Sequence, residues 1–529
     1  PMSVSAHAEK PTAADEELDR LEAAGVIIGE IVLDIGDVFD TSTPKENKSV
    51  FRLANRLHIN TRPSTITSQL LFRRGDKLTR HDIQESARLL RANSFFYDAS
   101  VTILDVTDNV ARVKVTTRDN WTLLPRLSFS RSGGESRYQF GFEEQNLLGT
   151  GSSVTVERRK DDDRRSTSFE FFDRNLGRTW VRLGLEYRDN SDGEAAAITL
   201  LRPFYALDTR WSAGTLMRLN DREEPLFSRG DETGRFRQDE QRLEVYYGRS
   251  AGLINNLTRR WSFGVAIDDN TFSPLADQPN PVPLPADREL RYPFIHFEQI
   301  ENRFEVAQNF DQILRTEDLY LGTRFGVRLG VLSESLGSDR DGLVIAANAS
   351  SSFGSPQRSL VTVASQMQGR VESGTLVNAT VGGSVTLHHR QSPKRMAFAA
   401  INGVAGRRLD IDNPILLGGN TGLRGYPRAF GNGDARAVLT LEQRYFTDWY
   451  PFRLFRVGGA AFFDIGRSWG EDSLGVRDDR ILSNAGIGLR LGSTRGNSNR
   501  IVHIDLAFAL RDDPQVDDVQ LLIEAKRGF

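Results

Sequence analysis

The sequence predicts a mostly β protein, in which a large antiparallel β-barrel of the membrane-spanning kind follows one small α+β domain. Apolar and polar residues alternate with a period of two through most of residues 121–529. Along the same stretch, long charged connections alternate with shorter turns. Residues 26–120 differ, because they carry strand and helix patterns in the order strand, helices, strand, strand.

Composition excludes several classes of protein. The 529 residues carry a formal net charge of −3, which argues against nucleic-acid binding, since such proteins are normally more basic. The chain has no cysteine, so disulfides and cysteine-ligated metals are excluded. It has no run of about eighteen apolar residues, so no membrane-spanning helix is expected. A transmembrane barrel remains open, because every second residue of its strands faces the lumen.

The first residues, 1–25, are polar and are expected to form a short helix or to stay mobile. Ala6, His7 and Ala8 have the small-x-small form of a secretory cleavage site, although no charged or apolar signal region precedes them. Whether residues 1–8 are the remnant of a signal peptide stays open.

Residues 26–120 are expected to form a small independent core. Thr79 and Asp82 mark a helix start, and Asp108-Asn109 is a hairpin turn signal. The expected elements are a strand over 28–38, helices over 49–58, 64–71 and from 79 onward, and strands over 100–106 and 110–117.

The barrel prediction rests on alternation such as that of residues 321–330. Phe325, Val327 and Leu329 would face one way, and Arg324 and Arg328 the other. In a barrel the polar face lines a watery lumen and the apolar face meets lipid. The count of candidate strands is about twenty, an even number as a bacterial barrel of this kind requires.

Connection lengths support the same fold, because outer-membrane barrels sort long loops to one side and short turns to the other. The expected long connections are 160–165, 220–241, 269–288, 332–342, 466–480 and 510–519, and the expected short turns include 173–178, 352–358 and 390–395.

A glycine-rich stretch, residues 418–427, contains the single charged residue Arg424. Two later strands supply carboxylates: Glu442 shares a face opposite Leu439 and Leu441, and Asp464 lies opposite its apolar neighbours. Because adjacent antiparallel strands bring residues of one face together, both carboxylates would point into the lumen. We therefore expect the loop to fold inward, with Arg424 bound to Asp464 and Glu442. The alternative is that the two carboxylates simply line a wet lumen.

Four motifs, in order, resemble those of the BamA/TamA superfamily, which includes the two-partner-secretion translocators. Residues 145–151 resemble its early periplasmic turn, and residues 441–445 a later strand. Its signature in the sixth extracellular loop is matched by Leu423, Arg424, Gly425 and Tyr426, and its following strand by 462–469, with Phe462 and Gly466. Residues 26–120 resemble a POTRA (polypeptide-transport-associated) domain.

This resemblance implies an outer-membrane protein that inserts polypeptides into the bacterial outer membrane or translocates them across it. The POTRA domain would lie in the periplasm and receive an extended client, and residues 407–434 would be the inward loop. Outer-membrane lipid, periplasmic chaperones and accessory envelope proteins are the further partners implied, with no cofactor, metal or nucleic acid. The chain departs from the family in having one POTRA-like domain and more candidate strands than the family's sixteen.

Two other functions are kept as alternatives. A passive diffusion channel would leave the POTRA-like segment and the Arg424 motif unexplained. An outer-membrane hydrolase would need a nucleophile, a base and an orienting group. The histidines, including His388, His389 and His503, are scattered along the sequence, so no such group of residues stands out. We therefore expect no enzyme.

Overall fold

The structure is a computed structural model. It describes residues 13–132, 135–161, 163–276, 282–472, 475, 477–494, 501–511, 513–526 and 528. The expectation for residues 1–8 lies outside these described residues. The chain divides into two compact units, one built mainly from residues before 123 and the other from the remainder.

The smaller unit is an α+β domain with a three-stranded sheet. Its elements are α1 (Ala13–Ala23), β1 (Ile27–Gly36), α2 (Ser49–Leu57), α3 (Pro63–Thr67), α4 (Arg80–Arg91), β2 (Phe96–Thr107) and β3 (Val110–Asp119). The sheet order is β1-β3-β2, with β1 parallel and β2 antiparallel to β3. The expected order of strand, helices, strand, strand is therefore present.

Local signals explain where these elements begin and turn. The Thr79 side chain accepts a hydrogen bond from the Asp82 backbone N–H at 3.1 Å, which caps α4. Asp108 and Asn109 both have positive φ, as a tight hairpin turn between β2 and β3 requires. The core gathers Ile28, Leu90 and Phe96 with their apolar neighbours.

The helix α2 differs from α4, because its apolar side chains are exposed. Val50, Leu53 and Leu57 each expose more than half of their surface, and no residue of α2 is buried. The small domain thus presents an apolar helix face to its surroundings.

The turn motif at residues 145–151 belongs to the same unit as the small domain. The Arg62 backbone N–H donates to the Gly149 carbonyl at 3.0 Å, and the Thr65 hydroxyl donates to the same oxygen at 2.8 Å. Gly149 has a φ of +74°, which a glycine adopts without strain.

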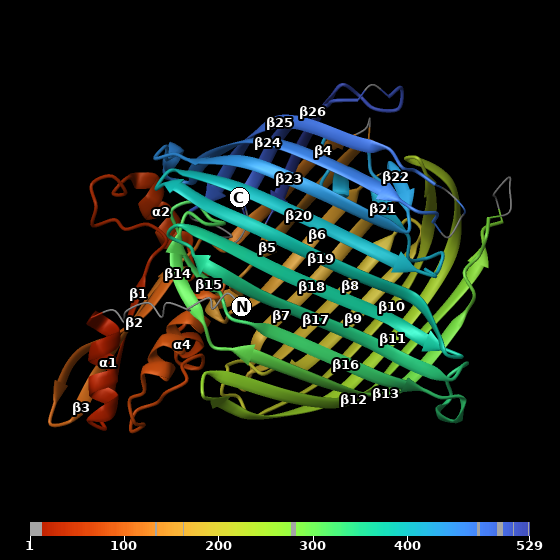
Figure 1. The fold of residues 1–529 in the computed structure, drawn as a ribbon. Coiled ribbons are helices and arrows are strands. Elements are labelled where there is room, and N and C mark those ends of the chain that lie inside the picture. Colours follow the sequence, from red (N-terminus) through yellow and green to blue (C-terminus); the bar gives the residue numbers. More distant parts are fainter. Residues whose placement is uncertain are drawn as a thin grey trace, which may run out of the picture. The chain divides into compact units, whose positions relative to one another are not determined.

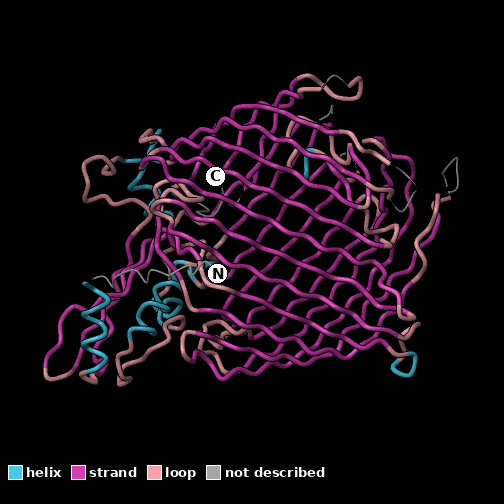
Figure 2. The backbone as a smooth tube through the Cα atoms, in the orientation of Figure 1, coloured by secondary structure: helices cyan, strands magenta, loops and turns pink. Residues whose placement is uncertain are grey.

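The larger unit is a closed antiparallel barrel of twenty strands, drawn as arrows in Figure 1 and as tilted magenta traces in Figure 2. Its first ten strands are β4 (Leu123–Ser132), β5 (Glu135–Glu144), β6 (Ser152–Lys160), β7 (Arg165–Leu176), β8 (Val181–Asn190), β9 (Gly193–Arg202), β10 (Trp211–Ser228), β11 (Asp231–Ile254), β12 (Leu257–Pro274) and β13 (Arg288–Glu301).

The second ten strands complete the barrel. They are β16 (Arg324–Leu332), β17 (Gly342–Ser355), β18 (Ser359–Glu372), β19 (Thr375–Ser392), β20 (Arg395–Arg407), β23 (Ala435–Phe446), β24 (Phe455–Trp469), β25 (Ile481–Ser493), β26 (Ile501–Ala509) and β27 (Val519–Lys526). β27 lies beside β4 and closes the sheet. The count of about twenty is confirmed, and the family's sixteen strands are exceeded.

Strand direction defines two ends of the barrel. The proximal end is where β4 begins and β27 ends, and the distal end is opposite. Because the strands alternate in direction, the connection 408–434 lies at the distal end and the connection 302–323 at the proximal end. Each contains a small sheet of its own: β21 (Ile415–Leu417) pairs with β22 (Gly431–Gly433), and β14 (Phe304–Gln308) pairs with β15 (Thr316–Tyr320).

Two expectations for the barrel are wrong. Residues 220–241 are not a long loop, because β10 and β11 continue as a paired ribbon to a turn at Arg229 and Gly230. The strand expected from residue 321 begins at Arg324, and Leu321 is buried at 1% exposure in an apolar cluster instead.

Among the described residues, the helices are all too short or too polar to cross a membrane.

Candidate functional site

The connection 408–434, called here the inward loop, folds back among the barrel strands. The pairing of β21 with β22 closes its base, and residues 418–430 form the loop proper. Leu417, Leu423, Tyr426 and Phe430 are fully buried, and they pack with Val438 of β23. Val438 shares the inward face of β23 with Thr440 and Glu442, so this cluster lies inside the barrel.

Glycines allow the loop to turn in this crowded space. Gly422 has a φ of +115°, a conformation that side chains rarely adopt. A Cβ added at Gly425 would lie 2.7 Å from Cβ of Asn484 on β25. Any larger residue at position 425 would therefore push the loop away from the barrel wall.

Arg424 is the centre of the site and is only 6% exposed. Its Nε donates to Asp464 Oδ2 at 2.9 Å and its Nη2 to Asp464 Oδ1 at 2.8 Å. Its Nη1 donates to Glu442 Oε1 at 2.8 Å. The structure thus brings together the three side chains that the sequence singled out. The bidentate geometry fixes the orientation of the guanidinium as well as its position.

The wall around Arg424 completes its environment. The guanidinium lies 3.5 Å from the centre of the Phe462 ring, a cation–π contact from β24. Glu442 Oε2 accepts a 2.9 Å bond from Arg444 Nε, so this carboxylate lies between two arginines. The predicted motif residue Phe462 therefore contacts Arg424 directly, and Arg444 extends the network.

Three further residues belong to this network, although no motif marked them. Asn484 Nδ2 donates to Asp464 Oδ2 at 2.8 Å. Asp505 Oδ2 lies 3.6 Å from Arg424 Nη1, and its Oδ1 accepts a bond from the fully buried Arg490. The sequence could have indicated these three residues through the alternation of the strands, because residues 484, 490 and 505 all fall on inward faces of β25 and β26.

The other predicted residues hold the loop by shape. The Tyr426 hydroxyl donates to the Ser483 carbonyl at 3.0 Å, and its ring is fully buried. A Cβ added at Gly466 would lie 3.3 Å from Leu423 Cδ1 and 3.1 Å from Val438 Cγ2. The absence of a side chain at Gly466 therefore leaves room for Leu423.

The outer part of the inward loop is tied to distal ends of several strands. The Asn432 amide donates to the Phe227 carbonyl at 2.8 Å, and its oxygen accepts from the Arg229 backbone N–H at 3.2 Å. Arg288 Nη2 donates to Asp412 Oδ2 at 2.6 Å. The loop is thus held both inside the lumen and across the ribbon of β10 and β11.

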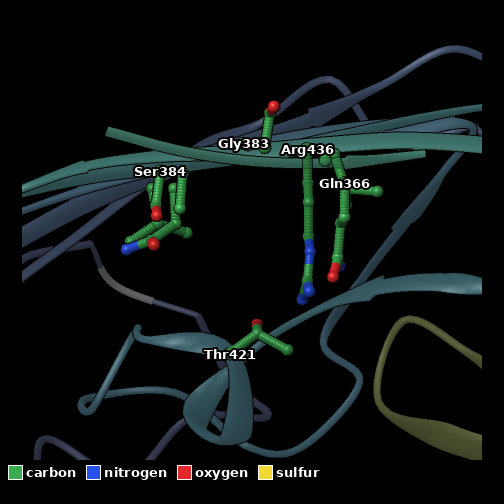
Figure 3. Close-up of a pocket in the computed structure, with 12 residues that line it drawn as sticks. Gln366, Gly383, Ser384, Thr421 and Arg436 are labelled. Carbon is green, nitrogen blue, oxygen red and sulfur yellow. The ribbon is translucent and has the colours of Figure 1, made fainter. Parts of the chain in front are cut away.

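A cavity of about 350 Å³ lies between the inward loop and strands β18 to β23. Figure 3 shows Gln366 and Arg436 pointing from the wall toward Thr421 of the loop. Arg436 Nη1 donates to the Leu416 carbonyl at 2.6 Å.

The inner surface of the barrel has two unlike walls, as strand register shows. On β17 to β20 the inward residues beside the cavity are small or uncharged; this neutral wall comprises Asn348, Ser350, Gln366, Gly382, Ser384, Thr386 and Asn402. On β4 to β16 several inward residues form ion pairs across strands. This charged wall includes Arg126 with Glu143, Arg222 with Glu240, Arg260 with Glu298 and Arg328 with Glu244.

The histidines considered as catalytic bases lie apart from one another. His503 Nε2 lies 2.7 Å from the Gly528 carbonyl, and the His388 ring lies 4.1 Å from the Phe310 ring. His389 Nδ1 lies 2.8 Å from the hydroxyl of Ser359 at the proximal end. Within the described part of the chain, His389 makes no hydrogen bond or ion pair with a carboxylate.

The sequence matches no protein-family model and no curated protein. Solved structures similar to it include BamA from Haemophilus ducreyi lacking POTRA domains 1–3, at 13% identity over 95% of this chain and 84% of that one, with a TM-score of 0.41. CdiB from Escherichia coli is similar at 12% identity, 94% and 76% coverage and a TM-score of 0.47. CdiB from Acinetobacter baumannii is similar at 10% identity, 94% and 73% coverage and 0.44.

Proposed function

We propose that this chain is a bacterial outer-membrane protein that inserts client polypeptides into the membrane or passes them across it. The inward loop would act as a lock, held by Arg424 against Asp464 and Glu442. The small domain would be a periplasmic POTRA domain that receives the client. No covalent chemistry is required of the protein.

The observation that carries the proposal is the Arg424 contact set. Arg424 makes a bidentate bond to the fully buried Asp464, an ion pair with Glu442 and a cation–π contact with Phe462. Burial of the loop alone would not require so many specific contacts to one side chain. Buried pairs of this kind fix position better than they add net stability. A loop fixed inside a lumen is a natural gate for a chain that must pass through or beside it.

The outer surface of the barrel supports its place in a membrane. Large apolar side chains are exposed along the strands, as in the run of Leu127, Phe129, Phe140, Phe142 and Val156. In water such a surface would aggregate, whereas lipid solvates it. With a periplasmic small domain, the proximal end faces the periplasm and the distal end faces outward.

The small domain offers a way to receive an extended client. In the sheet order β1-β3-β2, β2 lies at an edge. An extended peptide adds to such an edge by backbone hydrogen bonds, and pockets for its side chains give specificity. The exposed apolar face of α2, with Val50, Leu53 and Leu57, provides a surface for apolar client side chains.

The test uses the purified full chain in lipid vesicles with two probes. A urea-unfolded outer-membrane barrel protein measures insertion, and an unfolded secreted polypeptide measures crossing, each scored by protease protection. We expect the protein to accelerate one of them. Arg424→Ala and Asp464→Ala should each reduce the acceleration strongly, and the double variant should lose little more than either single variant. Normal activity of both single variants would refute the lock, and no acceleration by the unmutated protein would refute the function.

The chain offers a matched control for these variants. Arg328 on β16 donates to Glu244 at 2.9 Å and lies 3.5 Å from the centre of the Phe294 ring. It repeats the ion pair and cation–π contact of Arg424 but lies on a wall strand instead of the loop. Arg328→Ala should therefore leave transport intact. A loss of transport equal to that in Arg424→Ala would mean that any change of charge in the lumen disturbs transport, and that Arg424 has no special role as a lock.

A diffusion channel is the second candidate, because the charged wall resembles the lining of a water-filled pore. Conductance across a planar bilayer separates the two functions. A locked translocator is expected to conduct little, with more opening in Arg424→Ala. A steady open pore that is unchanged by Arg424→Ala would favour the channel.

A further inference from the structure

The connection 302–323, called here the proximal hairpin, is longer than the connections of neighbouring strands at its end of the barrel. β17 and β18 are joined by residues 356–358 and β19 and β20 by residues 393–394. The proximal hairpin instead forms the separate sheet of β14 and β15, paired from Phe304 with Tyr320 to Gln308 with Thr316. Its tip is residues 309–315.

The tip buries apolar side chains against the inside of the barrel. Phe310 is 4% exposed and Ile313 5%. They cluster with residues from five different strands: Leu360 (β18), Met396 (β20), Phe446 (β23), Ala460 (β24) and Ile501 (β26). Strand register puts these five on the same inward face as Arg444 and Thr362. The hairpin therefore crosses the proximal opening from β13 and β16 to the other side.

Polar contacts shape the tip and fasten it. The two carboxyl oxygens of Glu317 accept hydrogen bonds from the backbone N–H groups of Phe310 and Asp311, each at 2.9 Å, and these bonds hold the turn in its bent form. From β19, Arg390 Nη2 donates to the carbonyls of Gln308 at 2.9 Å and Asn309 at 3.0 Å. The tip is thus a formed structure with its own internal bonds.

A line of charges runs from the hairpin tip to the inward loop. Asp311 Oδ1 lies 4.0 Å from Arg444 Nη1. Arg444 bonds one oxygen of Glu442, and Arg424 bonds the other. Glu442 is therefore linked to two segments that enter the lumen from opposite ends: directly to Arg424 of the inward loop, and through Arg444 to Asp311 of the hairpin. The Asp311 contact is the longest of the three, and that side chain is half exposed, so it is the weakest link.

We infer that the proximal hairpin is a plug that closes the periplasmic end of the lumen, and that its release is coupled to release of the inward loop through Arg444 and Glu442. Moving the hairpin removes the Asp311 carboxylate from Arg444 and so changes the charge beside Glu442, the carboxylate that Arg444 shares with Arg424. Coupling of this kind is reciprocal, so releasing the loop also loosens the hairpin. The inference deepens the proposed function and rests on it for the biological role of opening.

The plug is tested by a reversible disulfide tether. Because the chain has no cysteine of its own, the two introduced cysteines can pair only with each other within one molecule. A Cβ built at Gly492 on β25 would lie 3.7 Å from Ile313 Cβ. This separation is within the range of natural disulfides. In the full chain carrying Ile313→Cys and Gly492→Cys, with Arg424→Ala to free the loop, we expect oxidation to remove the open events in bilayer conductance and reduction to restore them. Equal conductance in the oxidised and reduced forms would overturn the plug.

The coupling is tested by hydrogen exchange without any client, so its outcome does not depend on transport. Arg424→Ala should speed exchange in residues 304–320, and Asp311→Asn should speed exchange in residues 415–433. The expected rise is about two- to fivefold, the range for a half-exposed ion pair. Arg328→Ala, on the charged wall, should change neither segment. Unchanged exchange in both segments would overturn the coupling while leaving the tether result, and the proposed function, to be judged separately.

Discussion

Two segments enter the barrel from opposite ends, and they are held by different forces. The inward loop also buries apolar side chains, but its centre is fixed by charge: Arg424 binds Asp464 and Glu442, and Asp505 Oδ2 lies 3.6 Å from Arg424 Nη1. The proximal hairpin is fixed mainly by apolar packing of Phe310 and Ile313 on five strands. Charged contacts are directional and need particular residue types, whereas apolar contacts need only volume. The first kind leaves a motif in a sequence, and the second does not.

The largest effect is expected from removing the charged contacts of the inward loop. Arg424→Ala leaves Asp464 and Glu442 buried without their shared cation, and losing one partner of a buried pair costs about 3–5 kcal/mol. We expect the loop to leave the lumen, which limited proteolysis of residues 418–430 would detect. Arg424→Lys should restore only part of the protection, because an ammonium cannot repeat the bidentate bond. Full protection of the loop in Arg424→Ala would contradict this account.

The next effect addresses the apolar side. Phe310→Ala removes a buried ring from the hairpin tip and should weaken its docking by about 3 kcal/mol, the lower end for such truncations. Hydrogen exchange over residues 304–320 would measure the change. Val306→Ala is the control, because Val306 lies in the same hairpin but is 56% exposed. If both variants exchange alike, apolar packing does not hold the tip.

A smaller effect is expected from pH, and again on the hairpin. Burial, and then the neighbouring Asp311 carboxylate, raise the pKa of Glu317 to about 7, although backbone N–H donors act in the opposite direction. Because this pKa lies above that of an exposed glutamate, the stabilisation is complete below about pH 4.5 and is lost as pH rises through about 7. Arg390 is the cation that faces this carboxylate.

The measurement is hairpin exchange between pH 5 and 8, corrected for the intrinsic pH dependence of exchange. The corrected opening should increase with pH in the unmutated chain and be flat in Glu317→Gln. An opening that decreases as pH rises would show that the ionised carboxylate, bonded to backbone N–H groups, is the stabilising form.

The smallest expected effect is at Tyr426. Tyr426→Phe keeps the buried ring and removes only the hydroxyl that donates to Ser483, so the loop should lose about 1 kcal/mol of docking free energy. Exchange of residues 415–433 would report it, and transport should persist. A loss as large as that of Arg424→Ala would mean that the loop depends on this hydrogen bond as much as on charge.

Much of the barrel could be predicted because its signal is periodic. Alternation placed Glu442, Asp464 and Phe462 on inward faces, and the structure has them there. The strand count of about twenty followed from the same pattern. The limit lay where strands continue beyond their expected ends: the polar residues 220–241 read as a loop, but they pair as β10 and β11.

The proximal hairpin was missed for a physical reason. Leu321 fell within the expected strand 321–330, where alternation put it on the same face as Phe325 and Val327, the face that would meet lipid. Its partners Phe310, Met396 and Phe446 are distant in sequence, and no local pattern links them. One signal in the sequence could have indicated a segment inside the barrel. The inward faces of β18, β20 and β23 carry apolar residues, which a water-filled lumen would leave exposed to water.

The length of β11, at 24 residues, has a mechanical consequence. At about 3.3 Å per residue, such a strand is about 80 Å long, and even at the tilt of about 45° found in transmembrane barrels it extends beyond a bilayer core of about 30 Å. Beyond the lipid, β10 and β11 form a two-stranded ribbon, which is stiffened by the hydrogen bonds between its strands and by the neighbouring strands. The end of this ribbon hooks the inward loop through Asn432. A force applied at the distal end of the ribbon would therefore reach the inward loop through the bending of a β-ribbon, without any contact to Arg424.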